Sequence, residues 1–297
     1  MIDQTKNSSD TRNRLHCRER FAACVATTDA DLDLASAALW LAAEEYPELD
    51  PQIYLGRLES LAERVRVAWS RRPGTFAAFD ALRSVLVEEQ NFGGNSHHYF
   101  DPRNSFLNEV LDRRVGIPIS LSVVWIEVGR RAGIPIEGVN MPGHFVVRLL
   151  DRRQPLLVDP FCDGMLLTPE ACEERLRQTQ GNDVRLAPED LVAASSKQIL
   201  VRMLDNLRLV YLETEEYGRA LSAVDRIVLI VGETPKLRRD RGLLFARLRI
   251  YGKAWADLAA YLGSDEGREE GSDTSNEELS LLREHLERVR HLAAAPN

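Results

Sequence analysis

Residues 139–150 read VNMPGHFVVRLL, and residues 156–161 read LLVDPF. Each stretch holds a run of Val, Leu and Phe, and Pro142-Gly143 supplies turn chemistry before the first run, which is typical of adjacent β-strands. One strand would begin at His144 and the next would end at Asp159. In an antiparallel pair the start of one strand lies beside the end of the other, so the sequence predicts that these two side chains meet.

The segments before these strands predict helices. SLSVVWIEVGRRAG, residues 120–133, has no internal Pro, spaces its apolar residues by three and four, and ends on a Gly suited to a helix C-cap. Residues 31–90 show the same spacing, and Pro51 stands where the first turn of a helix tolerates proline. Helices followed by antiparallel strands indicate a mixed α+β fold that is mostly helical.

An internal repeat marks the C-terminal third of the chain. Tyr217-Gly-Arg-Ala-Leu recurs 34 residues later as Tyr251-Gly-Lys-Ala-Trp, and this spacing is the period of a tetratricopeptide helix pair. In this register Ala220 and Ala254 share one repeat position, where helices approach closely. Stacked repeats present an extended surface, so we expect a protein or peptide partner to bind through them.

These patterns predict that the chain is divided into three parts. We expect a disordered lead over residues 1–30, because its first twenty residues are polar. Residues 31–192 would form one domain with an N-terminal helical part, and residues 197–297 would form the repeats. A capping helix from Asn276 to Leu292 would close the repeats after a polar loop.

Composition excludes several classes of function. The net charge of −8 argues against nucleic-acid binding, and no apolar run is long enough to cross a membrane. The N-terminus lacks the apolar core of a secretory signal, so we expect a cytoplasmic protein. The four cysteines form no CxxC pair, which predicts free thiols and leaves no expected metal site or cofactor.

The predicted arrangement has the layout of an acyl-transfer site. In such a site a helix N-terminus lowers the pKa of a thiol, an imidazole takes its proton, and a carboxylate fixes the imidazole. Here the helix, the strand of His144 and the strand of Asp159 follow one another along the chain. The sequence thus raises the question of where the nucleophile lies.

Four segments of the chain resemble a known family. They are NFGGN (91–95), YFDPRNSFLNEVLDRRVGIPISLS (99–122), RRAGIPIEGVNMPGHFVVR (130–148) and LLVDPF (156–161). Together they resemble the SirB1 family, a branch of the transglutaminase-like superfamily that usually carries C-terminal tetratricopeptide repeats. The resemblance extends over residues 35–262 and implies a transglutaminase-like core built of a helix and an antiparallel sheet.

The resemblance implies catalytic roles for only two residues. His144 matches the superfamily histidine and Asp159 matches its aspartate. The superfamily places Gly-x-Cys at the helix start, whereas this chain has Gly116-Ile117-Pro118 there. Proline suits a first helical turn but carries no thiol. We therefore interpret the chain as a degenerate transglutaminase-like protein, not an enzyme, that keeps a remnant His–Asp pair and acts as a protein-binding or regulatory module.

An active hydrolase or acyltransferase with a relocated nucleophile is the alternative. Ser120 lies in the first turn after Pro118, although serine at a helix start is more often a cap. Cys162 follows Asp159 by three residues, but it lacks a helix start or a cation beside it in the sequence, so its thiol should have an ordinary pKa or a higher one.

The family segment also holds polar and aromatic residues that could line a pocket above His144: Asn91, Asn95, Tyr99, Asn104, Ser105 and Arg114. Their other interpretation is loop architecture. Asn side chains would bond the backbone in turns, and Arg114 would pair with Asp112 or Asp101. We favour loop architecture, because the sequence supplies no ligand geometry.

Overall fold

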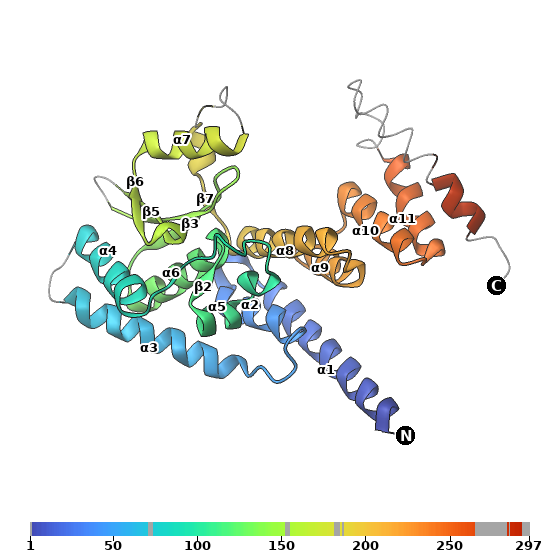
Figure 1. The fold of residues 1–297 in the computed structure, drawn as a ribbon, viewed down its shortest axis with the longest axis horizontal. Helices are drawn as coiled ribbons and strands as arrows, with labels where there is room; N and C mark the ends of the chain where they lie inside the picture. The colour runs from blue at the N-terminus through green and yellow to red at the C-terminus, as the bar shows by residue number, and fades with distance from the viewer. Residues whose placement is uncertain are drawn as a thin grey trace. The chain divides into compact units, whose positions relative to one another are not determined.

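The computed structural model describes residues 2–70, 74–151, 155–180, 185, 187–264, 284 and 286–292. The chain forms two compact units, Met1–Met203 and Leu204–Asn297. The predicted boundary between residues 192 and 197 differs from this division, because helix α8 (Ser196–Glu213) runs continuously past it. The fold is mixed α+β and mostly helical, as the sequence predicts (Figure 1).

The first unit contains most of the elements. Its longer helices are α1 (Ile2–Val25), α2 (Leu34–Ala43), α3 (Pro51–Ser70), α4 (Thr75–Arg83), α5 (Leu107–Arg113), α6 (Pro118–Ala132), α7 (Pro169–Gln180) and the start of α8. Its short helical segments are η1 (Asp29–Asp31), η2 (Ser84–Glu89), η3 (Pro102–Ser105), η4 (Pro160–Cys162) and η5 (Pro188–Leu191). Its strands are β1 (Gly93–Gly94), β2 (Val115–Gly116), β3 (Ile136–Val139), β4 (Val146–Leu149), β5 (Leu156–Asp159), β6 (Met165–Leu167) and β7 (Ala193–Ala194).

The disordered lead predicted for residues 1–30 is wrong. Helix α1 occupies most of it and packs against α2. Cys17, Phe21 and Val25 are buried, and their spacing of four residues gives the helix one apolar stripe. Arg18 of α1 donates two hydrogen bonds to the Glu44 carboxylate, at 2.6 and 3.2 Å. The polar composition of residues 1–30 led to the wrong prediction. A few apolar residues are enough to pack a helix when they share one of its faces.

The central sheet has five antiparallel strands in the order β6-β5-β4-β3-β7. The predicted strands therefore pair as neighbours, with Val147 of β4 opposite Val158 of β5. Helix α6, which Gly133 ends in the left-handed conformation, packs on one face, where its Ile126 lies close to Gly138 of β3. Helix α7 covers the other face, where Cys172 joins a core cluster with Val146 and Leu167. Figure 1 shows these two helices on opposite sides of the sheet.

A two-stranded parallel pair, β1 with β2, lies outside this sheet. Gly93 donates its N–H to the carbonyl of Arg114, and Asn95 donates to the carbonyl of Gly116. Gly94 needs to be glycine, because a Cβ there would lie 2.5 Å from the carbonyl oxygen of Phe161 and 2.7 Å from its ring. The NFGGN segment therefore presses directly on η4, the turn that follows Asp159.

The second unit contains the end of α8 and the helices α9 (Tyr217–Val231), α10 (Pro235–Arg247) and α11 (Tyr251–Gly263). The two repeated tyrosine motifs begin α9 and α11, and Ala220 and Ala254 are fully buried. Gly242 of α10 brings α11 close, because a Cβ there would lie 2.8 Å from Leu258. Of the predicted capping helix, residues 286–292 are helical, and most of the rest, with the polar loop, lies outside the described residues.

No helix within the described part of the chain is long and apolar enough to cross a membrane.

Candidate functional site

His144 and Asp159 form a hydrogen-bonded pair. The Nε2 atom of His144 lies 2.9 Å from Oδ2 of Asp159. Asp159 has no exposed surface, and its Oδ1 accepts the backbone N–H groups of Phe161 at 2.9 Å and Cys162 at 3.3 Å. The carboxylate thus caps η4 with one oxygen and holds the imidazole with the other.

Strand geometry explains why the two side chains meet. Side chains alternate between the faces of a strand, so Asp159 lies on the same face as Leu157. Leu157 packs on the cluster beneath α7, and so does Val146, two residues after His144. The strand order therefore brings the pair together on the face that α7 covers.

Arg175 of α7 completes the cluster, and the sequence interpretation missed it. Its Nη1 atom lies 2.7 Å from Oδ2 of Asp159 and 3.4 Å from Nε2 of His144. Its Nη2 atom lies 3.2 Å from the Sγ atom of Cys162. In the sequence Arg175 resembles one of many solvated charges on a helix. The available signal was its position three residues after Cys172, which places it on the helix face that packs inward.

The electrostatics of the cluster follow from these contacts. Burial by itself raises the pKa of a carboxyl group, but the hydrogen bond from His144 and the nearby charges of His144 and Arg175 place the pKa of Asp159 below its ordinary value. Burial raises the pKa of the Cys162 thiol, Arg175 opposes this change, and the Asp159 carboxylate adds to it. Cys162 therefore lies beside a cation, which the sequence did not indicate, yet burial keeps the pKa of its thiol above the ordinary value.

The expected position of the nucleophile is occupied by proline. Pro118 is the first residue of α6 and is buried, and Ile117 is the N-cap in extended conformation. Proline is favourable here because the first helical N–H has no partner within the helix. The local sequence thus forms a regular helix start without a thiol.

The Ser120 side chain makes hydrogen bonds to the backbone at the start of α6 and in the loop before it. Its Oγ atom accepts the N–H of Ile117 at 3.1 Å and lies 2.5 Å from the carbonyl oxygen of Asn104, to which it donates. The side chain is fully buried. A hydroxyl has one proton to donate, so this geometry commits it to a backbone contact and leaves none for a general base.

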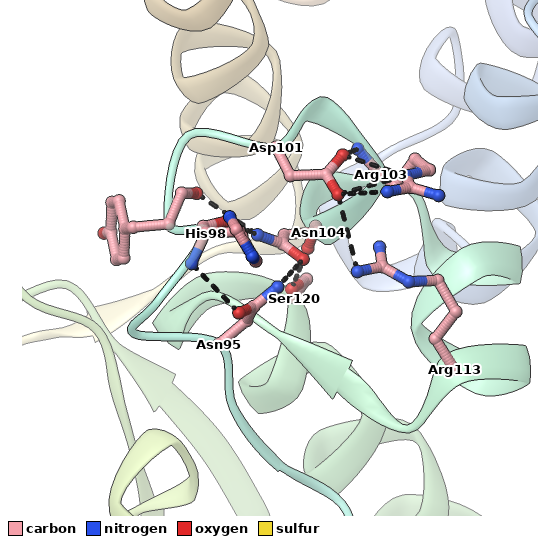
Figure 2. A network of polar contacts seen from close by, with 8 residues as sticks. Asn95, His98, Asp101, Arg103, Asn104, Arg113 and Ser120 are labelled. Atoms are coloured by element: carbon pink, nitrogen blue, oxygen red, sulfur yellow. Dashed lines mark hydrogen bonds and ion pairs between the residues drawn. The ribbon is translucent and has the colours of Figure 1, made fainter.

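Asn104 and Asn95 hold together residues 91–106, which we call the family loop, as Figure 2 shows. The Asn104 amide donates to the carbonyls of His98 at 2.7 Å and Tyr99 at 3.2 Å, and its oxygen accepts the Asn95 amide at 3.1 Å. Asn95 also accepts the N–H of His98. These hydrogen bonds join the Asn side chains to the backbone and to each other, as the loop-architecture interpretation expects. Ser105, the next residue after Asn104, is also buried.

The ion pair predicted for Arg114 is wrong. Asp101 binds Arg103 at 2.8 Å and Arg113 at 3.5 Å instead, while Asp112 pairs with Arg57. Arg114 has φ of 62°, in the left-handed region, where it ends α5. Asn91 is likewise left-handed, with φ of 59°, where the chain leaves η2.

Tyr99 links the family loop to the pair. Its ring centroid lies 6.1 Å from that of Phe161, which in turn lies 6.4 Å from the His144 ring. Gly94 also lies close to the Phe161 ring, which is 2.7 Å from the position that a Cβ on Gly94 would take. Of the six pocket candidates, Tyr99 is thus one aromatic ring away from His144, and Arg114 lines a separate cavity on α3.

Comparisons with known proteins define the class. A family model of the transglutaminase-like superfamily matches residues 52–205, just over half of the chain, and a tetratricopeptide repeat model matches residues 207–293. The chain is therefore a transglutaminase-like protein with C-terminal tetratricopeptide repeats. No solved structure matches it.

Relatives define the family more closely. The UPF0162 protein of Xylella fastidiosa (strain 9a5c) is 41% identical over 79% of this chain and 84% of its own length. The UPF0162 protein of Vibrio cholerae serotype O1 is 28% identical over 78% of this chain and 86% of its own. F-box only protein 21 of Mus musculus is 36% identical over 43% of this chain and 21% of its own. The chain belongs to the UPF0162 family, and the resemblance to SirB1-like proteins is confirmed.

Proposed function

We propose that this protein is a catalytically degenerate transglutaminase-like protein that acts as a protein-binding or regulatory module in the cytoplasm. The observation that carries the proposal is Pro118 at the first position of α6, where the superfamily motif has a cysteine. A pyrrolidine ring can neither attack a carbonyl group nor be activated by a base. His144 and Asp159 then persist as a structural pair.

The contacts of Asp159 support a structural role. In a triad the carboxylate orients the imidazole and stabilises the imidazolium that forms during attack. Here Oδ2 is shared between His144 and the permanently charged Arg175, at 2.9 and 2.7 Å. Part of the negative charge is neutralised by the guanidinium, so less of it is available to an imidazolium.

The repeats support the binding role. In the second unit a cavity of about 400 Å³ lies between the end of α8, α9 and α10. It is lined by apolar Leu212 and Leu243, by Tyr217, and by Arg208 and Arg247. A groove with apolar anchors and charged sides suits a peptide segment. We infer that the partner is a protein, which a pull-down from cell extract would identify.

A match between part of this chain and part of a much longer protein agrees with a module. The part shared with F-box only protein 21 is 43% of this chain but only 21% of that protein. A segment that recurs inside a much longer chain is suited to carry a surface to which other domains are added.

An active hydrolase or acyltransferase is the second candidate. The contact of Arg175 Nη2 with the Cys162 sulfur, at 3.2 Å, is the observation that favours it, because a neighbouring cation lowers a thiol pKa. Burial and the Asp159 carboxylate oppose that effect, so we place this candidate second. Ser120 is less suited, since its hydroxyl donates to Asn104.

The experiment restores the missing thiol. Pro118→Cys, made in a Cys162→Ser background, should label with iodoacetamide at pH 7 faster than Cys162 does in the parent, because a helix N-terminus stabilises a thiolate. Peptide mass spectrometry identifies the labelled residue. Adding His144→Ala should slow the labelling. A Pro118→Cys thiol that reacts no faster than Cys162, with or without His144, would contradict the proposal.

A further inference from the structure

A second cavity, of about 450 Å³, lies in the first unit, lined by α3 and by the segments that precede β1 and β2. Three arginines line it: Arg57 and Arg64 of α3, and Arg114. They come from parts of the chain about fifty residues apart. The parallel pairing of β1 and β2 explains the meeting, because Phe92 and Arg114 precede paired strands and so lie at the same end of the pair.

The arginines differ in how they are held. The Arg57 guanidinium pairs with Asp112 and lies 4.7 Å above the ring of Tyr54, and Arg64 pairs with Glu89. These contacts fix two of the cations in place. Within the described residues, the Arg114 guanidinium has neither a hydrogen bond nor an ion pair, and three cations face two carboxylates.

Neutral donors and an apolar floor complete the cavity. The hydroxyl of Ser60 and the amide of Gln90 line it beside the arginines. Beneath them lie Leu61, Phe92 and Leu111, which are buried. A ligand that fills this space needs an anionic group for the rim and a small apolar or aromatic group for the floor.

Arg114 carries the argument for a ligand. It ends α5 in the left-handed region, a common conformation at a helix C-terminus. The backbone of Arg114 is held there because its N–H bonds to Val110 and its carbonyl accepts the Gly93 N–H. Arg114, whose guanidinium is unpaired within the described residues, thus lines the cavity beside two arginines that are already paired.

We propose that this cavity is a binding site for a small phosphate ester. Guanidinium groups that approach from different elements match the oxygens of a tetrahedral phosphate, whereas a planar carboxylate is satisfied by one bidentate arginine. The site is lined by residues other than those of the His144 pair and does not depend on whether that pair is catalytic. Arg114 supplies the free charge, Arg57 and Arg64 supply the fixed ones, and Phe92 and Leu111 accept the organic group.

The test is isothermal titration of the full chain with phenyl phosphate, inorganic phosphate, benzoate and phenol at constant ionic strength. Phenyl phosphate should bind most tightly, inorganic phosphate more weakly, and benzoate and phenol at least tenfold more weakly than phenyl phosphate. Arg114→Gln and Arg64→Gln should each weaken phenyl phosphate binding about tenfold, since each removes one charge-assisted contact. Arg219→Gln, an equally exposed arginine of α9, is the matched control and should bind as the parent does.

Three results would overturn the proposal. They are the absence of saturable binding of phenyl phosphate by the parent, benzoate binding as tight as phenyl phosphate, and equal affinities in the parent and Arg114→Gln. Circular dichroism of each variant shows whether the fold is kept. Because all three substituted arginines are exposed at the surface, we expect unchanged spectra.

Discussion

Asp159 is the residue on which the site depends. It accepts two backbone N–H groups on one oxygen and two side-chain donors on the other, so every contact it makes favours the charged form. The carboxylate was found in the sequence by its strand position. Arg175 was not, because its contact with Asp159 depends on how α7 folds back over the sheet.

The contribution of Asp159 to the free energy of unfolding should be lost at acidic pH. Its folded pKa lies below the ordinary value, so the unfolded chain takes up a proton first as the pH falls. The stability it contributes is present above the ordinary pKa of about 3.9 and is lost as the pH falls through the folded pKa. We expect the difference in unfolding free energy between the parent and Asp159→Asn to narrow steadily below about pH 4. Urea unfolding between pH 5 and pH 2 measures it, and a constant difference would contradict the role of the charge.

Gly94 tests the contact between the family loop and η4. Gly94→Ala places a methyl group against the carbonyl and ring of Phe161, and we expect a loss of about 1–3 kcal/mol of unfolding free energy from overpacking. Gly56→Ala is the matched control, because nothing lies within 4 Å of a Cβ there and alanine favours the interior of α3 by about 0.5–1 kcal/mol. Chemical denaturation compares the two. If Gly94→Ala and Gly56→Ala had equal free energies of unfolding, the close contact between Gly94 and Phe161 would be contradicted.

At the scale of elements, residues 2–25 form the helix α1 in the structure, whereas the sequence analysis expected a disordered lead. Phe21 is fully buried between α1 and the helices it contacts, so Phe21→Ala should lower the unfolding free energy by about 3–5 kcal/mol. A disordered lead would tolerate the substitution without change. Thermal melts of the parent and of Arg12→Ala, an exposed position on the same helix, provide the comparison.

The repeat register is tested at the contact between α10 and α11. Ala254 is fully buried where Gly242 lets the helices approach, so Ala254→Leu should cost about 1–3 kcal/mol. Ala256→Leu, at an exposed position of the same helix, should be close to neutral. If the melting temperatures of the two variants coincide, the assigned register is wrong.

The elements that could be predicted have a strong local pattern. Helix α6, strands β3 to β5 and the starts of α9 and α11 follow from apolar spacing, Gly133 and the repeated tyrosines. The pairing of Arg113 instead of Arg114 with Asp101 could not be predicted, because it depends on how η3 and α5 pack together. The hydroxyl contact of Ser120 is likewise set by the approach of the Asn104 loop, 16 residues away.

At the scale of the whole molecule, the two units have separate chemistry. The His144 pair and the arginine cavity belong to Met1–Met203, and the groove between α8, α9 and α10 belongs to Leu204–Asn297. If the proposed function is correct, binding of a protein partner requires the groove between α8, α9 and α10 and does not require the His144–Asp159 pair. Leu243→Glu, which places a charge among apolar anchors, should abolish capture of the partner, and His144→Ala should leave it unchanged.

The absence of triad chemistry is the central claim, and hydrolysis of an activated ester tests it most directly. Release of p-nitrophenol from p-nitrophenyl acetate is measured for the parent, His144→Ala, Cys162→Ser and Ser120→Ala at equal concentrations. Because Pro118 offers no nucleophile and Ser120 is committed to Asn104, the parent rate should equal that of all three variants. A parent rate well above buffer that falls to the buffer rate in His144→Ala, and in either Cys162→Ser or Ser120→Ala, would contradict the claim and identify the nucleophile.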